Sequence, residues 1–366
     1  MNQTNTNPYR SLRVEFHILQ SFPVTCLNRD DVGAPKSAMI GGAMRARVSS
    51  QCWKRYVRMA LHENGVKLGS RTKLIKKLIA NACRELKATE DQAAACAEKV
   101  EKVFIKNADS DGAEDKSDTL LFLNEAEVRS IAEAFCGKGF DPDQVIKQKD
   151  AKKQAKEVAA LIGKKAYSED GLDIALFGRM VAQAATLNVE AAASFAHAIS
   201  THKVTNEVEF FTALDDCQEE PGSAHMGSLE FNAATYYRYV SLDIGQLWEN
   251  LAGQKIPEAV DAFVKALFLA VPGARQTTQS GACPWEFAKI FVRKGQRLQV
   301  PFETAVKAKD GGFLAPSKAA LIDYLAKKEK LFGSLFGKIE GFTFGEDEEY
   351  NIDNLLQDIK NAIPVG

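Results

Sequence analysis

The sequence lacks the features typical of secreted, membrane-spanning and metal-binding proteins. Its most apolar stretch, Val260 to Val271, is too short to span a bilayer and contains Lys265, and residues 1–10 are polar, unlike a signal peptide. The seven cysteines are scattered, with no C-x-x-C pair and no other zinc spacing. These absences predict a cytoplasmic protein with reduced thiols, no membrane contact and no bound metal.

Catalytic motifs are missing as well. No P-loop, dinucleotide-binding, nucleophile-elbow or zinc-protease signature occurs, and the five histidines are not arranged as a ligand set. The adjacent carboxylates of Asp30 and Asp31, in a loop-like segment, could bind magnesium near a phosphate, although a turn or an inter-subunit salt bridge is the more common use of such a pair. We therefore predict no catalytic residue and no cofactor.

A strong overall charge is also absent. The 366 residues are 45% hydrophobic and 26% charged, with a net charge of -1. This composition is that of a globular protein with two or three compact units. The near-zero net charge argues against a protein that coats nucleic acid with its entire surface, so only local charge could bind a polyanion.

Two windows break the charge balance. Val32 to His62 contains no Asp or Glu but six basic residues, namely Lys36, Arg45, Arg47, Lys54, Arg55 and Arg58. Val204 to Glu220 contains no Lys or Arg but six acidic residues, namely Glu207, Glu209, Asp215, Asp216, Glu219 and Glu220. The two windows are complementary in charge, which predicts that the acidic window docks on a basic surface of another copy.

The basic window has the pattern of a strand, a loop and a helix. Alternation over 14–19 predicts the strand, and Gly41-Gly42 indicates a backbone that something approaches closely. From Gln51 the apolar side chains recur at helical spacing, whereas the basic ones lie on the opposite arc. Ser49 and Ser50 suit a helix start, where free N–H groups and the helix dipole would accept a phosphate. A solvated amphipathic helix is the alternative.

The rest of the chain predicts an α+β core interrupted by a helical insertion. Residues 68–161 are helical in pattern around an acidic stretch at 107–118, where Asp109 and Asp111 lack the spacing of a calcium loop and indicate a flexible loop. Strands are expected at 174–177, 231–242 and 287–293, with helices near 191–199 and within 244–269.

Several long segments resemble the CasC-type backbone subunit ("Cas seven" family) of Cascade, the type I-E CRISPR surveillance complex. The segments are Cys26–Asp31, Arg47–Gln51 with Lys54-Arg55, Asp173–Met180, Ala196–His202, Gly222–Gly227, Phe231–Tyr239 and Ala305–Phe313. They are spread over nearly the whole chain, and only the helical insertion is weakly matched.

The resemblance implies an α+β fold with an RRM-like (ferredoxin-like) palm, inserted helical fingers and a protruding thumb. The implied boundaries are 1–64, 169–203 and 231–366 for the three parts of the palm, 65–168 for the fingers and 204–230 for the thumb. Copies, usually six, would stack head to tail along CRISPR RNA beside other Cascade subunits. Each thumb would displace one base of the guide, which pairs with the target DNA strand, and a separate or fused nuclease would cut the target.

The resemblance also implies site residues. Lys36, Ser49, Gln51, Lys54 and Arg58 match the family's contacts to the guide backbone, while Met180 and Met226 match the apolar pair that wedges at the displaced base. The predicted RNA-binding set further includes Arg45, Arg47, Ser50, Arg55 and His225. Lys149, Lys152, Lys153 and Lys156, on the last helix of the insertion, resemble a helix that holds duplex DNA, and a solvated face explains them equally well.

Two other classes of function remain open. The first is a metal-dependent ribonuclease of the type III backbone kind, because those relatives cut RNA with an Asp in a loop comparable to the one that holds Asp30 and Asp31. The second is a scaffold that binds only proteins through its basic face. The resemblance favours a non-catalytic, RNA-binding filament subunit in antiviral defence.

Overall fold

A computed structural model of the chain describes residues 7–104, 121–162, 171–181, 185–214 and 223–364. The chain divides into two compact units, the first formed by 1–60, 193–245 and 260–366 and the second by 61–192 and 246–259. Within the described ranges no helix is long and apolar enough to cross a membrane. The predicted loop with Asp109 and Asp111 lies outside the described residues, as do Asp215, Asp216, Glu219 and Glu220 of the acidic window.

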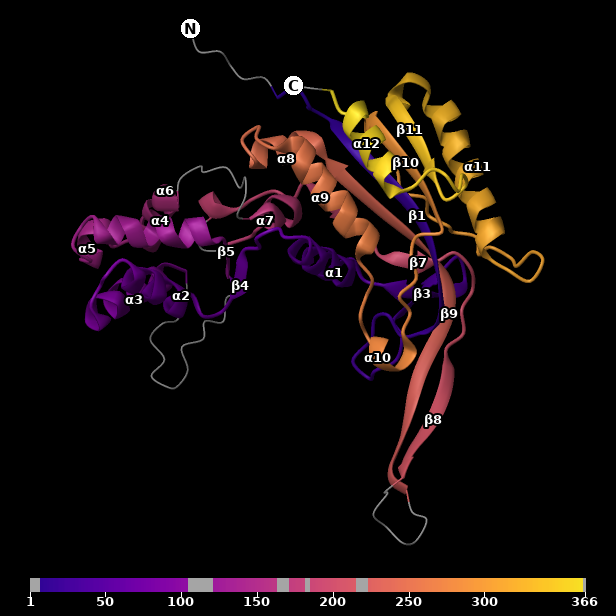
Figure 1. The fold of residues 1–366 in the computed structure, drawn as a ribbon, viewed down its shortest axis with the longest axis horizontal. Helices are drawn as coiled ribbons and strands as arrows, with labels where there is room; N and C mark the ends of the chain where they lie inside the picture. Colours follow the sequence, from indigo (N-terminus) through magenta and orange to yellow (C-terminus); the bar gives the residue numbers. More distant parts are fainter. Residues whose placement is uncertain (1–6, 105–120, 163–170, 182–184, 215–222, 365–366) are drawn as a thin grey trace. The chain divides into compact units, whose positions relative to one another are not determined.

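The first unit is built on an antiparallel sheet in the order β11-β10-β1-β9-β7-β3-β2, with β6 and β8 also paired to β9 (Figure 1). Its strands are β1 (Leu12–Thr25), β2 (Ser37–Ile40), β3 (Ala43–Val48), β6 (Ala193–Phe195), β7 (Ala198–Ser200), β8 (Glu207–Leu214), β9 (Ser223–Asp243), β10 (Phe287–Lys294) and β11 (Lys338–Phe344). The helices that lie wholly or partly in this unit are α1 (Ser50–Glu63), α8 (Ile244–Asn250), α9 (Ile256–Leu269), α10 (Gln276–Gln279), α11 (Leu314–Phe332) and α12 (Ile352–Ala362).

The central strand β1 is buried on both faces. On one face Phe16 packs edge-on against Phe263 of α9 and against Trp285. On the other face Leu19 belongs to a cluster that includes Leu321 and Leu325 of α11. The period-2 alternation therefore does not separate a dry face from a wet one, because helices cover both sides of the sheet.

The face toward α11 carries buried polar groups that satisfy one another. Glu15 forms a 2.8 Å ion pair with Arg293, and both side chains are at most 1% exposed. Glu15 also accepts hydrogen bonds from the Tyr239 hydroxyl and from the Leu298 backbone N–H. A buried carboxylate is tolerated here because its oxygens are paired and hydrogen-bonded. These contacts fix the segment around Leu298 across the sheet.

The strand β9 extends well beyond its pairing with β1. Its C-terminal part pairs with β1 from Asn232 to Asp243, and its N-terminal part pairs with β8 from Ser223 to Phe231. The two strands project from the sheet as a hairpin (Figure 1). We call the segments 207–214 and 223–231 the β8–β9 hairpin.

The second unit is mostly helical. Its described helices are α2 (Ile75–Glu85), α3 (Glu90–Phe104), α4 (Glu125–Cys136), α5 (Pro142–Val145), α6 (Ala151–Ile162) and α7 (Leu172–Phe177), with a two-stranded sheet of β4 (Ser70–Thr72) and β5 (Leu121–Leu123). The apolar faces of α2, α3, α4 and α6 form one core. A capping box between Asn124 and Glu127 begins α4, as the N-cap pattern requires.

Most predicted elements are confirmed, and two are wrong. The strands at 231–242 and 287–293, the helices within 244–269 and the helix from Gln51 are all present. Residues 172–177 form the helix α7 rather than a strand, because a short run buried on every side has no periodicity to distinguish the two. The Ala-rich segment 191–199 forms β6 and β7 rather than a helix, because pairing with β9 overrides its helix propensity.

Candidate nucleic-acid interface

The basic helix α1 begins at a capped and accessible end. The Ser49 hydroxyl accepts the Cys52 N–H at 3.2 Å, and the Ser49 N–H donates to the Asn28 side chain at 2.9 Å. The next two backbone N–H groups, at Ser50 and Gln51, lie in the first turn, where a helix offers no internal acceptor. Gln51 is exposed at this end. The helix start therefore offers free donors and a positive dipole end to an anion.

The two faces of α1 differ as the sequence predicts. Trp53, Val57 and Ala60 are at most 5% exposed. On the other face Arg55 is exposed and Lys54 is half-buried, with its ammonium group 5.8 Å from the centre of the Phe195 ring. Burial lowers the pKa of Lys54. Arg58 is also half-buried and has an interaction partner within the protein.

The β2–β3 hairpin packs on a neighbouring loop of the same unit. A Cβ placed on Gly41, which has φ +57°, would lie only 1.9 Å from the Glu303 carbonyl oxygen. The close approach predicted for this glycine is thus made by the protein's own backbone. A side chain here would displace the 303 segment.

Arg45 requires a correction. Its side chain is 0% exposed, and its guanidinium donates to the Ser200 carbonyl at 2.8 Å and the Phe302 carbonyl at 3.0 Å. The prediction that Arg45 contacts RNA is wrong, because the hairpin turns this side chain inward, where burial lowers its pKa. Acid-free sequence windows give charge but not direction, so sequence reasoning could not separate Arg45 from its neighbours.

The neighbouring basic residues remain accessible. Arg47 is half-buried, and its Nη1 lies 3.3 Å from Nδ1 of the exposed His197. Burial lowers the pKa of His197, and the positive charge of Arg47 lowers it further. Lys36 is half-buried at the end of the loop before β2, and its backbone pairs with Asn28 and Arg47. The structure therefore brings Lys36, Arg47 and the start of α1 together on one unit.

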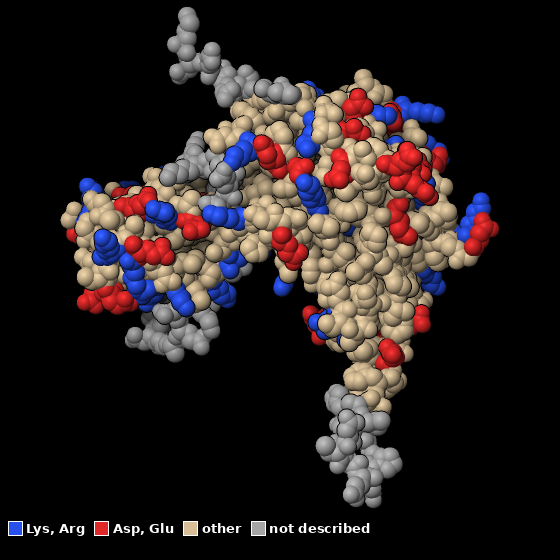
Figure 2. Space-filling view, viewed as in Figure 1, with Lys and Arg blue, Asp and Glu red and all other residues tan. Residues whose placement is uncertain are grey.

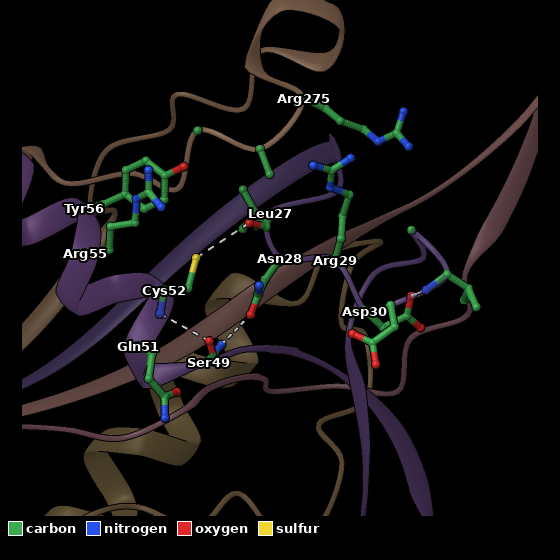
Figure 3. Close-up of a pocket in the computed structure, with 15 residues that line it drawn as sticks. Leu27, Asn28, Arg29, Asp30, Ser49, Gln51, Cys52, Arg55, Tyr56 and Arg275 are labelled. Atoms are coloured by element: carbon green, nitrogen blue, oxygen red, sulfur yellow. Dashed lines mark hydrogen bonds between the residues drawn. The ribbon is translucent and has the colours of Figure 1, made fainter. Parts of the chain in front are cut away.

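A broad pocket of about 930 Å³ lies beside the start of α1 (Figure 3). We call it the α1 pocket. It is lined by the loop 27–33, by residues of α1 and its cap, and by the loop 273–275. Two of its basic side chains, Arg29 and Arg275, are absent from the predicted site. Arg29 adjoins the acidic pair Asp30-Asp31, and Arg275 is far from the basic window in sequence. Apart from their charge, no sequence pattern marked either residue as part of the site.

Asp30 and Asp31 line the same pocket. Oδ1 of Asp30 accepts the N–H groups of Val32 and Ala34 at 3.0 and 2.9 Å, so this carboxylate closes its own turn. Over the described ranges, no group of three or more His, Cys, Asp or Glu side chains is placed to hold a metal ion. The arrangement matches the turn that the sequence analysis gave as the more common use of such a pair.

Met180 is held outward on the second unit. It is 82% exposed, although its neighbours Arg179 and Val181 are 6% and 2% exposed. Arg179 forms a buried ion pair with Glu127 at 2.8 Å and donates to the carbonyls of Leu187 and Phe122. Because Arg179 and Val181 are buried, the backbone holds the Met180 side chain in solvent. Its exposed apolar area contributes no burial free energy to the fold.

Met226 lies on a face of the β8–β9 hairpin that also carries the polar residues Thr212, Ser228 and Glu230. The register pairs Met226 with Thr212 and Phe210 with Ser228, so the alternating face carries Val208, Phe210 and Met226, which are 59%, 81% and 67% exposed. Most of the described hairpin surface in Figure 2 is uncharged. Phe210 was not singled out from the sequence, although the alternation of Val208, Phe210 and Thr212 with Glu207, Glu209 and Phe211 could have placed it. For His225 only the backbone, paired with Ala213, is described.

The lysines of the helical insertion form an exposed row. Lys149, Lys152, Lys153 and Lys156 are all exposed, while Ala155, Val158 and Ile162 of α6 face the core of the second unit. This is the disposition expected both of a solvated face and of a surface that attracts phosphates.

The observed fold and surface define an α+β protein with a basic helix start. A family model described as "CT1975-like protein" matches residues 14–358, and the chain belongs to this family. The resemblance to CasC-type Cascade backbone subunits is confirmed by this match.

Two solved structures are similar over almost the whole chain. A chain of a structure titled "CRISPR RNA-guided surveillance complex, pre-nicking" is 27% identical, with a TM-score of 0.79, and the match covers 96% of this chain and 99% of that one. A chain of "CRISPR RNA-guided surveillance complex" is 24% identical with a TM-score of 0.70 and the same coverage, which supports the fold. No curated protein sequence matches.

Proposed function

We propose that the chain is a non-catalytic backbone subunit that oligomerises along CRISPR RNA and presents the guide for pairing with target DNA. The observation that carries the proposal is the basic start of α1, where Gln51, Lys54 and Arg55 lie in the first two turns and Lys36 lies near Cys52 of the first turn. A similar chain is part of a complex whose title names RNA guidance. Family membership supports the same role.

This surface suits a protein that accepts any guide sequence. Lysine, arginine and backbone N–H groups bind phosphate and sugar, which carry no sequence information. The sheet aromatics Tyr237 and Tyr239 are 1% and 5% exposed, so they are not available to stack guide bases as in ordinary RRMs. Sequence would then be read by base pairing alone.

In this proposal residues 1–64, 169–203 and 231–366 are the RRM-like palm, residues 65–168 are the fingers and 204–230 the thumb. Met180 and Met226 would be the apolar wedge at a displaced base, and Phe210 shares the face of Met226. Their exposure supports this, because each presents apolar area that gains free energy only when something covers it. The exposed lysines of α6 would attract the phosphates of target DNA.

Copies would associate head to tail through different surfaces. Glu207 and Glu209 are exposed on the hairpin, in the described part of the acidic window. Docking of this acidic segment on a basic surface of the next copy is a heterologous contact, which builds an open filament rather than a closed dimer.

The test replaces two basic residues of this surface. In Lys36→Ala/Lys54→Ala we expect weaker binding to single-stranded RNA of every sequence alike, because only phosphate contacts are lost. The slope of log K against log salt should fall by about 0.7 per lost contact. Fluorescence anisotropy over a salt series, with several RNA sequences, measures both effects.

The matched control is Lys294→Ala/Lys330→Ala, which removes the same two charges from exposed positions at the ends of β10 and α11. Equal losses in both variants would show that the protein attracts RNA only through its total charge. A wild-type chain that purifies free of RNA after co-expression with a CRISPR array would favour the protein-only scaffold. Cleavage of bound RNA that is abolished by Asp30→Ala would favour the ribonuclease instead.

A further inference from the structure

The α1 pocket gathers positive charge from three separate segments. Arg29 comes from the loop after β1, Arg55 from α1 and Arg275 from the loop after α9. Burial raises the pKa of the Cys26 thiol, and both Arg275 and Arg29 are close enough to lower it in part. Figure 3 shows their guanidinium groups on the same side of the pocket. Like charges brought together repel unless an anion lies between them.

No carboxylate among the described residues pairs with Arg29 or Arg275. The nearest acid in sequence, Asp30, is engaged with the N–H groups of its own turn, and in Figure 3 it lies on the other side of Arg29 from Arg275. The pocket is lined by three arginines, Arg29, Arg55 and Arg275, and by two carboxylates, Asp30 and Asp31, so its lining carries an excess of positive charge.

The Arg275 loop is built tightly and keeps a donor buried. Arg275 has φ 55°, a left-handed conformation that is unfavourable for a residue with a side chain. A Cβ on Gly273 would lie 3.3 Å from the Tyr56 ring, so the loop packs directly on α1. The Nε of Arg275 is buried without a partner, as are both side-chain polar atoms of Gln279 on the following helix α10. Backbone strain and unsatisfied donors of this kind concentrate at ligand sites.

We propose that Arg29 and Arg275 bind a phosphate group of the RNA strand that passes the start of α1. The proposal rests on the proposed function and adds a second wall to its binding surface, drawn from two loops outside the basic window. An arginine fork matches two phosphate oxygens at once, which lysine cannot do. The site would fix the position of the strand as well as attract it.

The experiment uses the full-length chain and fluorescently labelled single-stranded RNA with a 5′-hydroxyl. Arg29→Ala and Arg275→Ala should each weaken binding about tenfold at low salt, the effect of losing one charge-assisted hydrogen-bonded contact. Each should also reduce the salt slope by about 0.7. Arg275→Lys should keep the slope but not the full affinity, because the charge remains while the fork is lost.

Controls separate the outcomes. Thermal melts identify any variant that fails to fold, and Arg29→Ala tests the site independently because Arg29 is exposed. If both arginine variants bind like Lys330→Ala while Lys36→Ala/Lys54→Ala loses affinity, this site is wrong and the proposed function stands. If the wild-type chain binds no RNA, the function itself fails. A loss seen only with 5′-phosphorylated RNA would assign the site to a terminal phosphate and overturn its assignment to an internal phosphodiester.

Discussion

Single residues in this protein differ sharply in how their charge is used. Arg45, Arg238 and Arg293 are among the largest fully buried side chains, whereas Arg29 and Arg55 are exposed. Arg238 stacks 3.5 Å from the centre of the Trp53 ring and donates to Gln20, and burial without a carboxylate lowers its pKa to about 9. The buried arginines stabilise the first unit, whereas the exposed and half-buried ones are available to a ligand.

The ion pair of Glu15 and Arg293 gives a prediction of stability. Arg293→Met should lower the free energy of unfolding by about 3–5 kcal/mol, because it leaves the Glu15 carboxylate buried without its cation. Arg13→Met is the matched control, since the pair of Arg13 and Asp243 is longer, at 3.4 Å, and partly exposed, and its loss should cost about 1 kcal/mol or less. Urea denaturation measures both, and equal losses would contradict the prediction.

His17 predicts a dependence of stability on pH. Burial, and secondarily Arg293, lower the pKa of His17 from 6.5 to about 3. Between pH 6.5 and about pH 3, His17 is therefore protonated in the unfolded chain but neutral in the folded chain. Stability should fall with decreasing pH across this window, by up to about 1.4 kcal/mol per pH unit for this group.

The variant His17→Gln tests that contribution. The imidazole Nδ1 lies 2.9 Å from the Tyr237 hydroxyl, a contact that a glutamine can partly replace without titrating. Urea denaturation at several pH values from 7 to 4 should show a shallower decline in the variant. The pKa of His202 is also lowered by burial, so a residual slope is expected. An unchanged slope would show that His17 does not contribute.

At the scale of elements, the β8–β9 hairpin has no core of its own. A two-stranded ribbon is marginally stable in water, and its apolar side chains Val208, Phe210 and Met226 are exposed. The hairpin is supported because β9 continues into the sheet, where it pairs with β1. Its exposed face is therefore available for binding, at little cost to the fold.

Substitutions on this face should separate function from stability. Met226→Asp should change the free energy of unfolding by no more than about 0.5 kcal/mol, because the side chain is 67% exposed, yet it should weaken pairing of complementary DNA with the bound guide. Ser228→Asp is the control, since it adds the same charge on the same face without removing apolar area. Thermal melts and target-binding assays on the assembled complex measure both effects, and normal DNA binding by Met226→Asp would exclude the wedge.

At the scale of the whole molecule, the proposed filament requires two different surfaces on each copy. The number of bound chains should then increase in steps with RNA length, as measured by light scattering or negative-stain imaging. Glu207→Lys/Glu209→Lys should reduce assembly without reducing binding of the first copy, because it reverses the charge of the hairpin only. Glu348→Lys/Glu349→Lys reverses the same charge at another exposed site and should assemble normally. Equal assembly by both variants would contradict the acidic contact.

The amino-acid sequence by itself determined the amphipathic helix α1 with its serine cap, the strand at 231–242 and the family. These depend on local periodicity, on a side chain bonding its own backbone and on long ordered motifs. Only the tertiary structure decided that Arg45 is buried, that 193–200 forms strands, and that Arg29 and Arg275 meet at the α1 pocket. The direction in which a side chain points, the pairing of strands and the meeting of two arginines in one pocket all depend on contacts between segments far apart in the chain. A local sequence pattern carries no information about those contacts.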